Sequence, residues 1–63
     1  MTQTERRALM NARVTLDGHP AIISGALADF PVVRRLDGKG GSVEFAWNTV
    51  ANIVNNHGGA FRS

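Results

Sequence analysis

The sequence contains no cysteine and no tyrosine, and it has a single tryptophan. Without cysteine the chain can form neither a disulfide nor a thiolate zinc site, two devices that stabilise many domains of this size. The only imidazoles belong to His19 and His57. Their nearest further ligand is Asp17, which stands in a turn where Asp is favoured for backbone reasons. We therefore predict that the protein holds no metal and no other cofactor.

Long hydrophobic runs are also missing, and residues 1–7 lead into no apolar signal region. We therefore expect no membrane contact and a location in the cytoplasm. The excess of positive over negative charge is also small. The chain has seven Lys and Arg against five Asp and Glu, and its formal net charge is +2. A dedicated nucleic-acid binder typically clusters Lys and Arg on one face, and this modest excess does not require such a face.

The 63-residue chain is long enough for one small domain. A domain of this size buries only about 60% of the surface that its unfolded chain exposes. Its core contributes roughly 3–5 kcal/mol once chain entropy is subtracted. With disulfides and thiolate metal sites excluded, association with a second copy is the remaining stabilising device, so we expect a homodimer or a marginally stable monomer.

Residues that could carry catalysis are few. Ser24 and Ser42 are candidate nucleophiles, but no motif pairs either one with an oriented His and a carboxylate. The Lys-Gly-Gly-Ser stretch at 39–42 precedes a predicted strand, whereas a phosphate-cradling loop precedes a helix. So small a domain also has little interior in which to shape a water-excluding pocket. We therefore predict that the protein is not an enzyme.

Four segments show the alternating or β-branched pattern of strands. They are 13–16, 21–26, 32–36 and 43–47. Asp17-Gly18 joins the first two, because a type I′ turn needs positive φ at both central positions. Leu-Asp-Gly at 16–18 recurs at 36–38, which predicts two successive hairpins built alike. Gly25 indicates a bend or bulge at which a strand curls.

The fourth segment places Val43, Phe45 and Trp47 on one face, and these side chains carry the largest apolar surface in the sequence. Two uses of the aromatic pair stay open. They pack into the core, or they form a platform on which the bases of single-stranded nucleic acid stack. We favour the core, because the helix that follows needs an apolar surface to pack against.

After residue 47 the period of the apolar pattern changes from two to about 3.6. Asn48 is the favoured N-cap of the resulting helix, and Thr49 is the other candidate. One stripe of this helix carries Val50, Ile53, Val54 and His57. Gly58 is a natural left-handed stop, so we place the helix at about 49–57. It is too short to be stable alone and must pack on the sheet.

The predicted fold class is α+β and mainly β: two antiparallel hairpins capped by a short C-terminal helix. The hairpins form either a curled four-stranded sheet or a small SH3-like barrel. Residues 13–63 make a single domain, and residues 1–12 form an arm that is either flexible or a short helix capped by Thr4. Phe61 folds back into the core or adds a short last strand. The predicted core comprises Val14, Leu16, Ile23, Val43, Phe45, Trp47, Val50, Ile53, Val54 and Phe61.

Two groups of basic residues are the candidate binding residues. They are Arg6, Arg7 and Arg13 near the start, and Arg34, Arg35 and Lys39 in the middle of the chain. Arg34 and Arg35 are neighbours on one strand and so point to opposite faces, which weakens any continuous basic stripe. Ordinary solvated charge is the alternative interpretation of both groups.

The turn and core residues also carry a resemblance. They read Leu16-Asp17-Gly18-His19-Pro20-Ala21, Leu36-Asp37-Gly38, Glu44-Phe45-Ala46-Trp47-Asn48-Thr49-Val50 and Gly58-Gly59-Ala60-Phe61. Over residues 13–63 the pattern resembles a group of short, uncharacterised proteins encoded by bacterial phages, plasmids and integrated elements. The resemblance implies the cytoplasm of a bacterial host, and it supplies no catalytic residues.

Three functions follow as hypotheses. The first is a non-enzymatic binding protein of a mobile element that occludes a host defence complex, as an anti-CRISPR does. It is argued from small size, absent catalytic groups, near-balanced charge and the resemblance, and its contact surface would use Arg34, Arg35 and Lys39 with the loop at 37–42. The second is a small nucleic-acid-binding β-barrel that acts as a regulator through all six basic residues. The third is a structural homodimer module.

Overall fold

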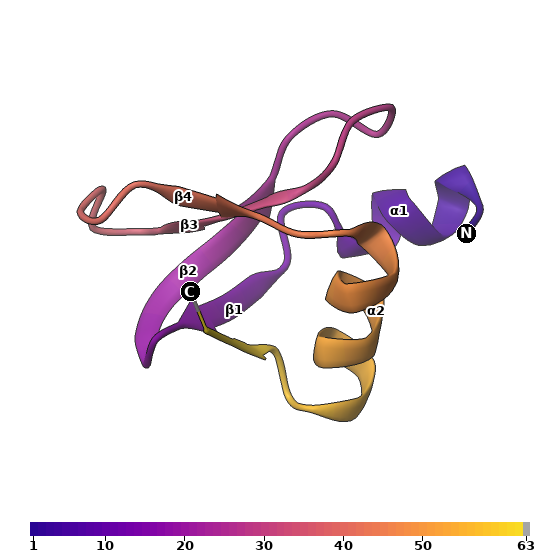
Figure 1. Cartoon of the computed structure of the whole chain (residues 1–63). Coiled ribbons are helices and arrows are strands. Elements are labelled where there is room, and N and C mark those ends of the chain that lie inside the picture. Colours follow the sequence, from indigo (N-terminus) through magenta and orange to yellow (C-terminus); the bar gives the residue numbers. More distant parts are fainter. Residues whose placement is uncertain (63) are drawn as a thin grey trace.

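The computed structural model describes residues 1–62 and shows a small, mostly β, α+β protein (Figure 1). Its helices are α1 (Gln3–Leu9) and α2 (Trp47–Asn56). Its strands are β1 (Arg13–Leu16), β2 (His19–Ser24), β3 (Val32–Arg35), β4 (Ser42–Glu44) and β5 (Ala60–Phe61). The strands form one sheet in the order β4-β3-β2-β1-β5.

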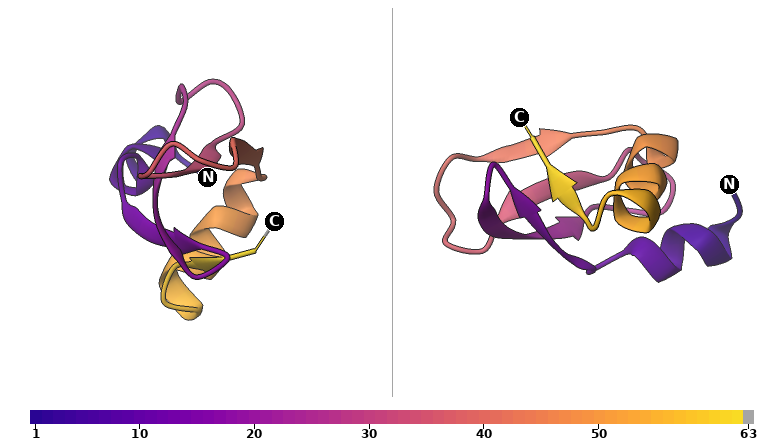
Figure 2. Two further views of the ribbon diagram at one scale, coloured as in Figure 1. Left: turned by 90° about the vertical axis from the view of Figure 1, so that its left-hand side faces the viewer. Right: turned by 90° about the horizontal axis from the view of Figure 1, so that it is seen from below.

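The sheet curls into a half-barrel, and α2 lies on its concave side (Figure 2). The predicted curl and the mainly β composition are therefore confirmed. The predicted number of strands is wrong, because the described residues form a five-stranded sheet and not a four-stranded one. It is mixed, since β5 runs parallel to β1 while the other neighbours are antiparallel. β4 and β5 are the two edges.

The first hairpin has the predicted turn. Asp17 and Gly18 both have positive φ, 52° and 82°, and Leu16 pairs with His19 across them. This two-residue turn fixes the register of β1 against β2. β2 differs from the predicted 21–26 because pairing begins next to the turn, at His19, and stops before Gly25, whose φ of 121° few other residues adopt.

The second Leu-Asp-Gly forms a different turn, so the prediction of two hairpins built alike is wrong. Here β3 ends at Arg35, and a loop of residues 36–41 separates it from β4. Gly38, Gly40 and Gly41 have positive φ in this loop, whereas Asp37 does not. The carboxylate of Asp37 accepts the backbone N–H of Lys39 at 2.9 Å, which holds the loop in place of a tight turn.

Trp47 is the first residue of α2, and the predicted strand 43–47 ends earlier, at Glu44. Trp47 fits both the two-residue period of a strand and the 3.6-residue period of a helix. It lies two residues after Phe45, and it also extends the helical stripe of Val50 and Val54 by one turn. The helical position wins because the indole N–H of Trp47 donates to the backbone oxygen of Asp29 at 2.8 Å, which holds the ring against the core.

The N-cap of α2 is accordingly Ala46, and the predicted caps Asn48 and Thr49 lie inside the first turn. Ala46 offers no side-chain cap. The helix ends as expected: His57 is the C-cap, and Gly58 follows with a φ of 66°. Gly59 then continues the turn so that the chain returns beside β1.

Phe61 is buried in the core and also belongs to the short last strand β5, so both of its predicted roles are confirmed. Leu16 pairs with Phe61, and Thr15 pairs with Ala60. Phe61 is buried on the concave side. A strand of two residues has too short a pattern to be recognised in the sequence.

The N-terminal segment forms the helix α1, so of the two predicted states the helix is the one observed. Its cap is Thr2 and not Thr4, and the helix accordingly starts earlier than expected. The hydroxyl of Thr2 accepts the backbone N–H of Glu5 at 3.2 Å, while the Glu5 carboxylate reaches back to the N–H of Thr2. This reciprocal pair is a capping box.

The core lies between the concave face of the sheet and α2, and Leu9 of α1 closes one end of it. Six predicted core residues are buried: Val14, Leu16, Ile23, Trp47, Val50 and Phe61. The other four are half-buried against the same core: Val43, Phe45, Ile53 and Val54. Three residues of the buried hydrophobic cluster were not predicted: Leu9, Ala21 and Val33.

Replacing Trp47 tests this arrangement, because the ring is only 5% exposed. We expect Trp47→Ala to destabilise the domain by about 3–5 kcal/mol, as for other large-to-small core changes. That exceeds or equals the whole stability of so small a domain, so the variant should lose its far-UV circular dichroism and its thermal transition.

The neighbouring change Asn48→Ala removes an exposed side chain and should leave the thermal midpoint nearly unchanged. The native protein should also show the blue-shifted tryptophan emission of a buried ring. A folded Trp47→Ala variant would contradict the assigned role of the indole.

Candidate functional site

The convex face of the sheet has no helix packed on it, because α2 fills the concave side and α1 packs on α2 at the end of the sheet. Alternation along the strands decides which residues reach this outer face. In β1 the exposed residues alternate with buried Val14 and Leu16. In β3 Val33 is buried, so the next residue, Arg34, points outward. The outer face is therefore the largest surface that secondary structure leaves open.

Three outward residues form one row across this face. Arg13 of β1 pairs with Ile22 of β2, and Ile22 pairs in turn with Arg34 of β3. The two arginines are thus two strand spacings apart, about 9–10 Å between their Cα atoms. Ile22 lies between them and is half-buried. We call this set the Arg-Ile-Arg row.

Both guanidinium groups of the Arg-Ile-Arg row are available to a partner. Arg13 and Arg34 are exposed, and among residues 1–62 neither forms an ion pair or a side-chain hydrogen bond. The nearest acid by register is Glu44, which pairs with Val32 on the adjoining row. The row therefore carries two unbalanced positive charges around an apolar centre.

Apolar side chains flank the row on both sides. Val32 lies on one side, opposite Ser24. On the other side Pro20 is exposed, and the backbone N–H of Leu36 donates to its carbonyl oxygen at 2.9 Å. Leu36 is 47% exposed, one of the most exposed large apolar residues described. The outer face thus combines apolar contact area with isolated positive charge, a composition typical of protein interfaces.

Arg6 does not join this surface. Its guanidinium lies over the ring of Trp47, 5.3 Å from the centroid, and Nη1 donates to the backbone oxygen of Leu27 at 2.7 Å. Its Nε is buried without a hydrogen-bond partner in the described part of the chain. These contacts hold α1 against α2 and the loop at 25–31. Arg7, by contrast, is exposed on α1, away from the row.

Arg35 is also engaged within the molecule. It points to the concave side, opposite to Arg34, as the alternation predicts, and its Nη2 forms an ion pair with Asp37. Lys39 is exposed at the tip of the 36–41 loop. Of the six predicted binding residues, the fold therefore brings only Arg13 and Arg34 together.

The carboxyl group of Asp37 is held in its charged form by the loop around it. The backbone N–H of Lys39 lowers the pKa of Asp37, and the side chain of Arg35 lowers it further. Both interactions favour the charged carboxylate, so protonation weakens the structure of the loop.

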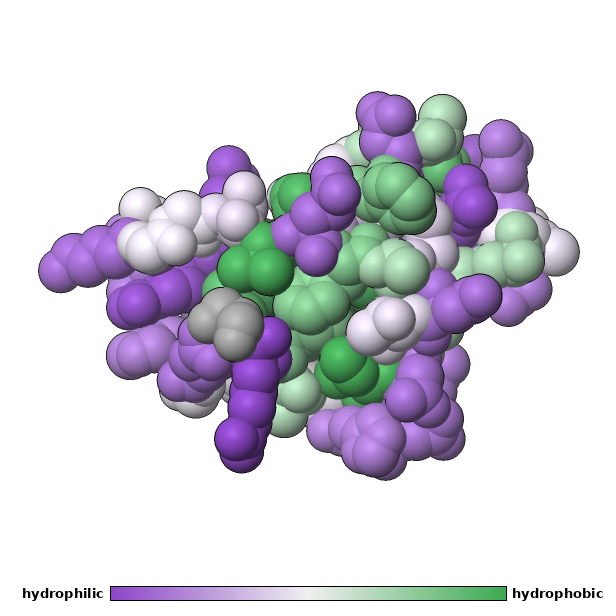
Figure 3. All heavy atoms as spheres, in the orientation of Figure 1, coloured by the Kyte–Doolittle hydropathy of each residue, from purple (hydrophilic) through white to green (hydrophobic). Residues whose placement is uncertain are grey.

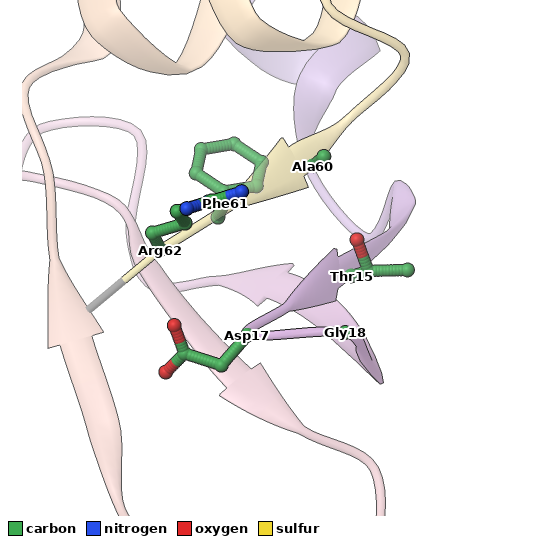
Figure 4. Close-up of a pocket in the computed structure, with 6 residues that line it drawn as sticks. All are labelled: Thr15, Asp17, Gly18, Ala60, Phe61 and Arg62. Atoms are coloured by element: carbon green, nitrogen blue, oxygen red, sulfur yellow. The ribbon is translucent and has the colours of Figure 1, made fainter.

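A hollow of about 510 Å³ lies beside the first turn and β5 (Figure 4). Its lining residues are Thr15, Asp17, Gly18, Ala60, Phe61 and Arg62. Neither histidine is among them. Among residues 1–62, no three His, Asp or Glu side chains converge where a metal ion could be held.

A second apolar area faces the opening between β4, α2 and β5 (Figure 3). Here the rings of Phe45 and Phe61 pack with their centroids 5.1 Å apart, and so bridge the two edges of the half-barrel. This contact places the aromatic rings in the core and leaves no exposed stacking platform on the outer face. Phe30, 59% exposed, stands apart in the 25–31 loop.

Comparison with protein-family models, curated proteins and solved structures finds no significant match. Neither helix in the described part of the chain has the length and apolar content needed to cross a membrane.

The sequence analysis did not identify Ile22 as the centre of the candidate site, although one of its two cross-strand pairings could be deduced from the sequence. The two-residue turn at Asp17-Gly18 fixes the pairing of Arg13 with Ile22 by counting outward from the turn. The pairing of Ile22 with Arg34 depends on the 25–31 loop, whose length and shape set no register from sequence alone.

The lowered pKa of Asp37 predicts a pH effect confined to acid. A carboxyl group whose folded pKa is below the unfolded value, about 3.9, stabilises the folded loop above that pH and loses this contribution as the pH falls through the folded pKa. We expect Asp37→Asn to loosen the loop at pH 7 and to match the parent chain near pH 2.

Amide hydrogen exchange of residues 38–41, compared between the two chains across this pH range, measures the effect. Glu44→Gln is the matched control, because the change also removes one carboxylate from the same hairpin. An equal difference between Asp37→Asn and the parent chain at pH 7 and pH 2 would contradict the assignment.

Proposed function

We propose that this chain is a non-enzymatic binding protein that covers a surface of another protein with the outer face of its sheet. The observation that carries the proposal is the Arg-Ile-Arg row, an apolar centre between two unpaired arginines on a face that no helix covers. Arg, together with well-packed apolar neighbours, is typical of the residues that dominate binding energy at protein interfaces.

The aromatic residues support a protein partner over single-stranded nucleic acid. Base stacking needs exposed rings beside a basic groove. Here Trp47 and Phe61 are buried, and Phe45 packs on Phe61. Arg6 and Arg35 are engaged by Trp47 and Asp37, which leaves fewer cations for phosphates.

Within this class, we propose a mobile-element protein that occludes a host defence complex in the bacterial cytoplasm, as an anti-CRISPR does. The resemblance of residues 13–63 to small proteins of phages and plasmids supports this narrower assignment. A protein that occludes another needs only a folded scaffold and one surface that binds the partner. In this proposal the curled sheet is the scaffold and its outer face is that surface.

Capture from bacterial lysate by the tagged full chain tests the proposal. We expect the chain to recover a host protein in stoichiometric amount. Ile22→Glu should reduce recovery by about tenfold or more, because it places a charge in the centre of an apolar contact. Arg34→Glu should also reduce recovery and slow association, and its exposed position leaves folding intact.

Asn48→Glu is the matched control, since it adds the same charge at an exposed position of α2 on the opposite side of the sheet. It should recover as much partner as the parent chain. Equal recovery by Ile22→Glu would remove the outer face from the proposal. Recovery that nuclease treatment abolishes would favour the nucleic-acid regulator. A dimer in sedimentation that Ile22→Glu dissociates would favour the homodimer module.

A further inference from the structure

We infer that the partner meets the outer face with an acidic surface in which two carboxylates flank an apolar side chain. This inference rests on the proposed function and specifies the chemistry of the partner. It follows from the spacing of Arg13 and Arg34, from the residue between them, and from the absence of an ion pair to either arginine among residues 1–62.

A partner that covers Ile22 must also cover both arginines. The pairing of Arg13 and Arg34 with Ile22 places the backbone of one arginine on each side of it, a single strand spacing away. Displacing water from a charged group without pairing it is unfavourable. An apolar or basic partner surface would leave two such groups unpaired, and carboxylates at these places pair a guanidinium group most strongly.

The planar shape of the guanidinium group further favours carboxylates on the partner. The planar guanidinium group binds a carboxylate through two parallel hydrogen bonds, which fixes orientation as well as charge. On a convex surface the ends of the two side chains diverge, so their separation exceeds the roughly 10 Å between their Cα atoms. In an extended chain, carboxylates at positions i and i+4 lie about 13 Å apart on one side, with position i+2 between them.

Protein carboxylates fit this face better than phosphates do. The apolar side chains of Ile22, Val32 and Leu36 find no matching apolar contact on a phosphate backbone. An acidic protein segment supplies both kinds of contact.

The test is a titration of the isotope-labelled full chain, followed by nuclear magnetic resonance, with the blocked peptide Glu-Ser-Val-Ser-Glu. We expect saturable shifts at the signals of Arg13, Ile22 and Arg34, with a dissociation constant on the order of millimolar. The peptide Lys-Ser-Val-Ser-Lys should shift none of these signals. Arg13→Gln and Arg34→Gln should each weaken binding of the acidic peptide about two- to fivefold.

Arg7→Gln is the matched control, because it removes an exposed arginine from α1 and should leave the titration unchanged. Absence of shifts with the acidic peptide, or equal shifts with the lysine peptide, would overturn the inference. So would tighter binding of a single-stranded oligonucleotide with the same number of negative charges to the same residues. If the acidic peptide fails while Ile22→Glu still abolishes partner capture, the proposed function stands and only the acidic partner is refuted.

Discussion

The structure depends on the placement of Trp47 at the start of α2. The indole N–H donates to the backbone oxygen of Asp29, and Arg6 lies over the ring and reaches the backbone oxygen of Leu27. Three segments far apart in the sequence, α1, the 25–31 loop and α2, are therefore fixed to one another by two side chains, those of Trp47 and Arg6. Because the ring must enter the core, α2 has to lie on the concave side of the sheet. That choice leaves the convex side uncovered.

The contacts of Trp47 also explain which elements could be predicted from the sequence and which could not. Local patterns placed β1, the turn at Asp17-Gly18, β3 and the end of α2 at Gly58, because the residues that specify them are neighbours in the sequence. Trp47 fits both a strand and a helix, and only its contact with Asp29, eighteen residues earlier in the chain, decides between them. Arg6 likewise looked like a surface cation, since nothing local shows that it will lie over an aromatic ring.

The candidate site illustrates the same limit. Arg13 and Arg34 could be named from composition, but they become a pair only through Ile22, whose register against β3 is a property of the whole sheet. Arg35 and Lys39 are near Arg34 in sequence and yet belong to the loop that Asp37 organises. Proximity along the chain was thus a poor guide to which charges act together, because successive residues of a strand face opposite sides.

The apolar residues of the outer face are not required by the core. An antiparallel sheet with one free side usually carries polar residues there, since water then satisfies that face. Here Ile22 and Val32 lie outward on neighbouring strands and the exposed Leu36 follows β3, although the concave side already contains the buried cluster with Val33 and Phe61. A chain of 63 residues has a single helix with which to cover its sheet, so every apolar residue outside that contact lowers solubility without adding to the core. These outward apolar side chains, with Ile22 between two arginines that form no ion pair among residues 1–62, are the observation on which the proposed partner rests.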